Sequence, residues 1–136
     1  MVRNVALVDG EIGAYGVVYP DAPGCTAMGA TLDEALRNAG EALAEWIADE
    51  IAAGREPAPP RSADEARRDP EVAQALTEGA MLTVVPLVMD YGRPTRINVS
   101  LDAGLLAAID EAAAERKLTR SAFLSTAARE KITAGG

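Results

Sequence analysis

Seven residues near the C-terminus, Thr95 to Leu101, alternate between polar and apolar side chains. This period of two predicts a β-strand with one apolar face. Two amphipathic helices are expected after it, over about 103–116 and from Thr119 to about 132, and no second strand follows. A lone strand leaves its amides unpaired, and a unit of fewer than roughly 50 residues rarely has a sufficient core. We therefore expect residues 91–136 to form a homodimer through antiparallel pairing of this strand about a twofold axis.

The alternation gives the strand two faces with different chemistry. The apolar face consists of Ile97, Val99 and Leu101, and the polar face consists of Arg96, Asn98 and Ser100. Arginine reads guanine, asparagine reads adenine through two hydrogen bonds, and serine contacts either base. A two-stranded ribbon fits the major groove, so the polar face is a candidate reader of DNA sequence. The alternative is a solvated strand face on an ordinary helical unit.

The start of the last helix is a second candidate contact with DNA. Thr119 is a suitable N-cap, and Arg120 and Ser121 follow it directly. The amides and dipole of a helix N-terminus bind anions, so these three residues are expected to hold a phosphate group.

Residues 1–90 show another order of elements. Three short strands separated by glycine-containing turns precede an amphipathic helix over 32–53, which begins with the capping box of Thr31 and Glu34 and ends before Gly54. Three prolines exclude regular structure over 55–62, and two short helices and a last strand are expected after them. This order predicts an α+β domain, β-β-β-α-β, with the long helix on one face of the sheet. The expected strands are Val2 to Val8, Ala14 to Tyr19, Cys25 to Met28 and Leu82 to Val88, and the apolar stripe of the helix is Leu32, Leu36, Leu43, Ile47 and Ile51.

The charge differs between the two parts of the chain. The overall net charge is −8, but residues 1–90 carry 6 basic and 16 acidic residues, whereas residues 91–136 carry 7 basic and 5 acidic residues. The net charges are therefore −10 and +2, which indicates two domains with different partners. An acidic N-terminal domain repels nucleic acid and attracts a basic protein.

Several classes of protein are excluded by what the composition lacks. There is no histidine and a single cysteine, Cys25, which removes the usual general base, the usual zinc ligand and any internal disulfide. We expect no catalytic residue, metal or cofactor, and we interpret Cys25 as a core residue. No apolar run approaches the roughly 20 residues of a membrane span, so a cytoplasmic protein without membrane contact is expected.

Two sets of motifs resemble known families. The segment from Arg96-Ile-Asn-Val-Ser-Leu-Asp to Leu118-Thr-Arg-Ser-Ala-Phe-Leu resembles the ribbon-helix-helix repressors of the Arc/MetJ type. The first 54 residues resemble the N-terminal half of HicB antitoxins. That likeness rests on Val18-Tyr-Pro-Asp-Ala-Pro-Gly-Cys-Thr, Gly29-x-Thr-Leu-Asp-Glu-Ala and Glu41-Ala-Leu-x-Glu-Trp46. The resemblance implies a degenerate ribonuclease-H-like domain over 1–90 and a ribbon-helix-helix domain over 91–136.

The same resemblance implies a function without enzymatic activity. The N-terminal domain would neutralise a HicA-like, RNA-cleaving toxin by direct binding, and the C-terminal domain would bind operator DNA and repress the operon. The candidate toxin contacts are Asp21, Glu45, Trp46 and Asp49. Trp46 is equally compatible with the edge of the core. A stand-alone repressor whose N-terminal domain senses a small ligand is the alternative function.

One position departs from the ribbon-helix-helix pattern. The helix before the last one usually ends with glycine, but Lys117 stands there. A left-handed lysine costs roughly 1–2 kcal/mol, so the sequence leaves open whether this turn is formed in another way.

Overall fold

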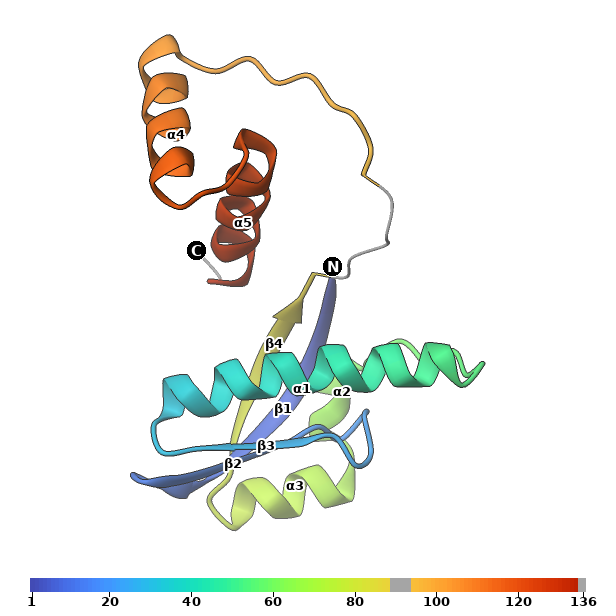
Figure 1. Ribbon diagram of the computed structural model, residues 1–136. Helices are drawn as coiled ribbons and strands as arrows, with labels where there is room; N and C mark the ends of the chain where they lie inside the picture. Colours follow the sequence, from blue (N-terminus) through green and yellow to red (C-terminus); the bar gives the residue numbers. More distant parts are fainter. Residues whose placement is uncertain (89–93, 135–136) are drawn as a thin grey trace. The chain divides into compact units, whose positions relative to one another are not determined.

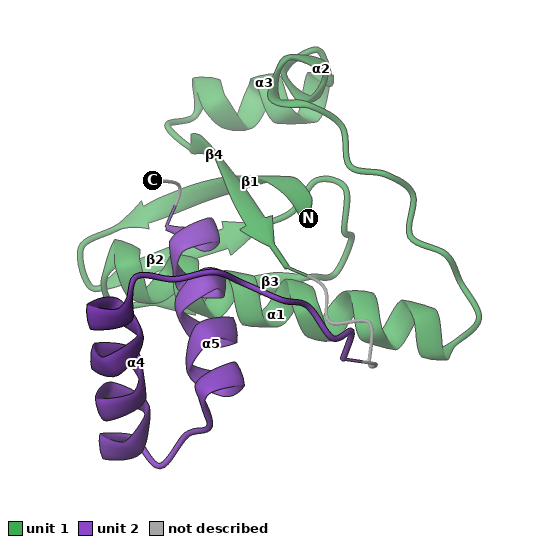
Figure 2. Cartoon of the chain, turned by 90° about the horizontal axis from the view of Figure 1, so that it is seen from above, with its two compact units in different colours: residues 1–89 green, residues 90–136 purple. Residues whose placement is uncertain are grey.

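The computed structural model describes residues 1–88 and 94–134. The chain divides into two compact units, Met1–Met89 and Asp90–Gly136, which are coloured separately in Figure 2.

Unit 1 contains a four-stranded antiparallel sheet. Its strands are β1 (Val2–Glu11), β2 (Ala14–Val18), β3 (Thr26–Gly29) and β4 (Met81–Leu87), in the spatial order β3-β2-β1-β4 (Figure 1). Leu7 of β1 pairs with both Val18 of β2 and Leu82 of β4, which fixes the register across the sheet. The α+β architecture and the β-β-β-α-β order predicted from the sequence are confirmed.

The helix α1 (Leu32–Ala52) covers one face of this sheet. Thr31 caps it as predicted, because the Thr31 hydroxyl accepts a hydrogen bond of 3.1 Å from the amide of Glu34. Small residues on the helix allow a close approach to the sheet, and Leu43 fills the centre of the interface. The buried side chains between helix and sheet are Ala6, Val8, Val17, Tyr19, Ala22, Cys25, Ala35, Ala39, Leu43, Ile47 and Val85. Ile51, expected in the same stripe, is 55% exposed, because it lies in the last turn of α1 beyond these contacts.

Three side chains tie α1 to the segment containing β2 and β3. The hydroxyl of Tyr19 donates to the backbone oxygen of Ala39 at 2.7 Å. The side chain of Asn38 donates to the backbone oxygen of Met28 at 2.8 Å, and the indole of Trp46 donates to that of Pro23 at 3.2 Å. These bonds fix α1 along the side of the sheet formed by β2 and β3.

The other face of the sheet carries two short helices, which were expected from the sequence without a position. The helices α2 (Ala63–Arg67) and α3 (Pro70–Thr77) lie on the side of the sheet away from α1 (Figure 2). Val5 and Leu7, which alternate with the residues under α1, are buried on that side, as are Ala66 and Val72 of the two helices. A helix of five residues gives too short a periodic signal to predict which surface it packs against.

Two strand boundaries differ from the expected ones. The first strand continues through Gly10 to Glu11, because Gly10 adopts φ +88° within the strand and the chain reverses only at residues 12–13. The last strand was expected over Leu82 to Val88, whereas β4 runs from Met81 to Leu87 at the edge of the sheet, where Val84 is 42% exposed.

Unit 2 contains two helices, α4 (Ala103–Glu115) and α5 (Arg120–Thr133). Asp102 caps α4 by accepting hydrogen bonds from the amides of Gly104 and Leu105. Thr119 caps α5 by accepting one from the amide of Ala122. Residues 94–102 before α4 are not part of a helix or strand in the single chain (Figure 1).

The turn between α4 and α5 has a left-handed lysine. Lys117 has φ +56°, and it is the non-glycine residue with positive φ among the described residues. The amide of Leu118 donates to the oxygen of Ala113, and that of Lys117 donates to the oxygen of Ala114. These two bonds make a Schellman motif, so the turn takes the usual form in spite of the cost of a left-handed side chain.

Candidate functional site

The candidate DNA-reading segment is exposed on both of its faces in the single chain. Arg96, Asn98 and Ser100 are exposed, as their proposed role requires. The alternating apolar residues are exposed as well: Ile97 by 74%, Val99 by 60% and Leu101 by 37%. A strand needs a hydrogen-bonded neighbour, and the described part of unit 2 supplies none to this segment.

The two helices of unit 2 share a small core. Among the described residues of this unit, Ile109 and Ala113 of α4 are the buried ones. Phe123 and Leu124 of α5 are half-buried, whereas Leu105 is 51% exposed. Ala127, Ala128 and Ile132 of α5 are exposed. One copy of this unit therefore leaves most of its apolar surface in water.

The start of α5 holds an ion pair that the sequence did not predict. Arg120 donates two hydrogen bonds of 2.8 Å to the carboxylate of Asp110 on α4. The pairing lowers the pKa of Asp110 and raises that of Arg120. Ser121 is exposed beside this pair. A phosphate at this end of α5 would share the Arg120 guanidinium with Asp110.

The candidate toxin contacts on α1 fall into two kinds. Glu45 and Asp49 are exposed on the helix. Trp46 is half-buried, packs against the core cluster and donates its indole hydrogen bond to Pro23. The core-edge interpretation of Trp46 therefore has direct structural support, and its contact with a partner stays a prediction.

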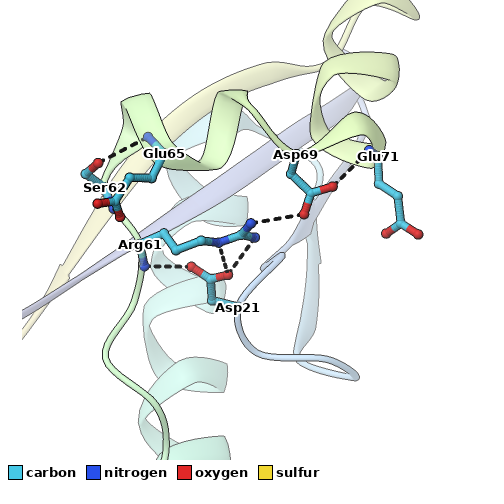
Figure 3. A network of polar contacts seen from close by, with 6 residues as sticks. All are labelled: Asp21, Arg61, Ser62, Glu65, Asp69 and Glu71. Carbon is cyan, nitrogen blue, oxygen red and sulfur yellow. Dashed lines mark hydrogen bonds and ion pairs between the residues drawn. The ribbon is translucent and has the colours of Figure 1, made fainter.

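The fourth candidate, Asp21, lies inside a network of polar contacts centred on Arg61 (Figure 3). The amide and side chain of Arg61 donate to the two carboxylate oxygens of Asp21 at 2.9 and 2.8 Å. The same guanidinium reaches Asp69 at 3.1 Å, and Asp69 caps α3 by accepting a hydrogen bond from the amide of Glu71. The Asp21 side chain is 15% exposed. Asp21 thus joins the β2–β3 loop to the segment before α2, and little of its carboxylate faces a partner.

The Arg61 network is sensitive to pH in a defined direction. The amide of Glu71 and the side chain of Arg61 lower the pKa of Asp69 below its ordinary value of 3.8. A carboxylate with a lowered pKa in the folded state stabilises the fold above its unfolded-state pKa. That contribution is lost as the pH falls from about 4 through the lower folded-state pKa.

Replacing Arg61 with methionine is expected to lower the melting temperature at pH 7, because Asp21 and Asp69 lose their shared cation while the aliphatic stem is kept. The difference from the wild-type chain should narrow as the pH falls from about 4 through the lowered pKa of Asp69. Thermal unfolding followed by circular dichroism at several pH values measures this. Arg67→Met, at an exposed position on α2, is the control. An equal loss at pH 7 and pH 3 would show that the ion pairs are not its cause.

The structure also bears on the lone cysteine, on metal sites and on membrane spans. Cys25 is 5% exposed, and burial raises the pKa of its thiol, which supports its interpretation as a core residue. Across residues 1–88 and 94–134, no three acidic or thiol side chains come together as a metal site would require. None of the helices in the same ranges is long and apolar enough to cross a bilayer.

Sequence reasoning missed the partners Arg61 and Asp110. Arg61 follows a proline-rich segment and reaches Asp21 across 40 positions of sequence, and Asp110 reaches Arg120 across a turn. The periodicity of the sequence predicts neither contact, because each depends on how separate elements pack. Complementary charge alone leaves many other pairings open.

Comparison with known proteins identifies similar chains. A family model described as the HicB_like antitoxin of bacterial toxin-antitoxin systems matches residues 4–128. A protein of Haemophilus phage HP1, named an uncharacterized 14.9 kDa protein in the rep-hol intergenic region, is 31% identical over 122 residues. That match covers 87% of this chain and 88% of the phage protein.

Solved structures show the same likeness. The crystal structure of the Burkholderia pseudomallei antitoxin HicB has 33% identity and a TM-score of 0.54, over 96% of this chain and 98% of that one. A chain in the HicA3 and HicB3 toxin-antitoxin complex has 25% identity and a TM-score of 0.55, over 65% of this chain and 100% of that one. The antitoxin HicB3 has 28% identity and a TM-score of 0.52, over 96% of this chain.

Proposed function

Because the chain belongs to the family of HicB-like antitoxins, we propose that it neutralises a HicA-like, RNA-cleaving toxin through unit 1 and binds operator DNA as a homodimer through unit 2. Members of this family are regulators and not enzymes. In this proposal the chain acts in the cytoplasm, where its operon is transcribed, and represses that operon.

The toxin-binding part of the proposal is supported by the charge of unit 1 and by a relative. The HicB3 relative is solved in a complex with the toxin HicA3, and the match covers 65% of this chain. Residues 1–90 carry a net charge of −10, which accelerates association with a basic partner. Glu45 and Asp49 of α1 are exposed contributors to that field, and we retain them as candidate toxin contacts together with Asp21 and Trp46.

The observation that carries the DNA-binding part is the uncovered apolar face of unit 2. The exposed side chains of Ile97, Val99 and Leu101 alternate with Arg96, Asn98 and Ser100 in a segment without a strand partner. Pairing with the same segment of a second chain would bury the first set against the helices and present the second set twice. This is the ribbon-helix-helix arrangement, with Thr119, Arg120 and Ser121 placed near the DNA backbone.

The fold of unit 1 has a matching explanation. We interpret its antiparallel sheet and long covering helix as a degenerate ribonuclease-H-like domain that has kept the scaffold without a nuclease centre. Nuclease chemistry of that kind uses carboxylates that hold two metal ions, and the acidic residues of this unit lie mainly on its helices.

Co-expression of the chain with the protein encoded beside it is expected to yield a stable complex that survives purification. The partner should be small, basic and toxic when expressed alone, and its toxicity should disappear with this chain present. The complex should weaken as the salt concentration rises, because opposite charges contribute to association. Size-exclusion chromatography of the tagged chain at two salt concentrations measures this.

A ligand-responsive repressor would behave differently in the same experiment. Its neighbour would neither co-purify nor be toxic, and operator binding would change on addition of a small molecule. Failure of the wild-type chain to bind or neutralise the adjacent product would contradict the antitoxin proposal.

A further inference from the structure

The face of the sheet away from α1 is covered over only part of its width. Val5 and Leu7 of the central strand β1 are buried on this face, as are Ala66 and Val72 of α2 and α3. The register places Val18 beside Leu7 and Thr26 beside Val18, and it pairs Met28 with Gly16. We call the surface formed by Gly16, Val18, Thr26 and Met28 the open sheet face.

The open sheet face exposes two apolar side chains beside a glycine. Met28 is 70% exposed and Val18 is 43% exposed. Gly16 lies between β1 and Met28 and contributes no side chain of its own. Methionine is unbranched and adapts its shape to different neighbours, which suits a contact surface.

The charged residues on β2, on β3, in the loops beside them and at the adjoining end of β1 are acidic. Asp9 pairs with Gly16, and its carboxylate lies over the glycine, with Oδ1 2.8 Å from the position that a Cβ would take. Glu11 follows on the same side of β1 by alternation. Between Arg3 and Arg37 the sequence contains no lysine or arginine, so neither β2, β3 nor the loops beside them carry a basic residue. These strands and loops therefore favour contact with cationic groups of a partner.

Two of the toxin contacts expected from the sequence are occupied by internal bonds. The carboxylate of Asp21 is held by Arg61, and the indole of Trp46 is bonded to Pro23. Met28 and Val18, in contrast, present side chains that an added partner would cover. The open sheet face thus combines exposed apolar area with a free acidic rim.

We propose that the open sheet face is the docking surface for the toxin, with Val18 and Met28 contacting aliphatic or aromatic side chains of the toxin and Asp9 pairing with one of its lysines or arginines. This inference rests on the proposed function, and it assigns toxin contact to residues that the sequence had not singled out. The acidic residues of α1 add to the long-range attraction of a basic toxin.

The test compares two exposed aliphatic positions changed in the same way. Met28→Lys on the open sheet face is expected to weaken binding of the co-purified HicA-like toxin by about 30-fold or more, as the loss of a central contact does. Ile51→Lys, at the exposed end of α1, makes the same change in charge away from the open sheet face and should alter the affinity by less than about threefold. Isothermal titration at one salt concentration measures both, and circular dichroism checks that each variant is folded.

A second pair of variants separates local charge from overall charge. Asp9→Asn keeps the shape of the side chain and should reduce the salt dependence of toxin affinity, because one ion pair is lost. Glu56→Gln, in the exposed segment after α1, removes one charge elsewhere and should leave the salt dependence close to that of the wild-type chain.

The outcomes distinguish the two proposals. If the wild-type chain binds the toxin and Met28→Lys binds it equally well, or if Ile51→Lys loses as much affinity as Met28→Lys, the docking surface is wrong and the antitoxin function stands. If the wild-type chain binds no HicA-like toxin, both proposals are wrong.

Discussion

Replacing Gly29 with alanine is expected to destabilise unit 1 by about 3 kcal/mol or more, because the added methyl group would overlap backbone atoms. A Cβ at this position would lie 2.4 Å from the backbone nitrogen of Ala35 and 2.7 Å from its Cα. These atoms belong to the first turns of α1, where the helix crosses β3. A helix backbone cannot turn away as a long side chain can, so α1 and β3 would have to separate.

Gly40 provides the matched control for this substitution. It lies in α1, and a Cβ there meets no atom within 4 Å outside the helix's own backbone. Gly40→Ala should therefore stabilise the chain by about 0.5–1 kcal/mol, the usual difference between alanine and glycine inside a helix. Urea unfolding of both variants measures the two changes. A loss for Gly29→Ala below about 1 kcal/mol would show that α1 and β3 are not held as closely as described.

Much of unit 1 could be predicted because its signals are local. The capping box at Thr31 and Glu34, the apolar stripe of α1 and the glycines at the turns each act within a few residues. The placement of α2 and α3 on the second face could not be predicted, because their contact with Val5 and Leu7 depends on the return of the chain after a proline-rich segment.

In the candidate sites, too, local features could be predicted and contacts between separate elements could not. The N-cap of α5 at Thr119 was predicted from a short sequence pattern, and the structure confirms it. The clamp of Arg61 on Asp21 and the pairing of Arg120 with Asp110 are contacts between elements, and they change the surroundings of two residues that had been selected for their charge. The exposure of Met28 and Val18 likewise follows from which part of the sheet the short helices leave uncovered.

Buried polar groups are another feature that composition does not reveal. Asn4 of β1 is 5% exposed, and its side-chain oxygen has no hydrogen-bond partner. The position alternates with apolar residues on a strand, where a periodic pattern favours an apolar side chain. A buried oxygen without a hydrogen-bond partner lowers stability. The alternating pattern of the strand therefore gives no reason to expect a polar side chain at this position.

Val99→Lys is expected to convert the full-length chain from a dimer to a monomer. In the proposed ribbon the Val99 side chains of two copies would be buried, and a charged group without a partner is costly to bury. Binding of one half-site by a monomer then replaces binding of a whole operator by a dimer. Operator affinity should fall by about a thousandfold or more, toward the level of non-specific binding. Toxin binding should be unchanged, because unit 1 is a separate compact unit.

The neighbouring residue separates dimerisation from DNA reading. Asn98 lies on the opposite face of the same predicted strand, so Asn98→Ala should leave the dimer intact and cost roughly 1–3 kcal/mol in operator binding. Sedimentation of the full-length variants gives the oligomeric state. Fluorescence anisotropy with the DNA upstream of the chain's own gene and with a scrambled duplex, at one fixed salt concentration, gives specificity. A dimeric Val99→Lys chain with wild-type operator affinity would contradict the ribbon. An equal loss on both duplexes for Asn98→Ala would show instead that the polar face contacts DNA without reading its sequence.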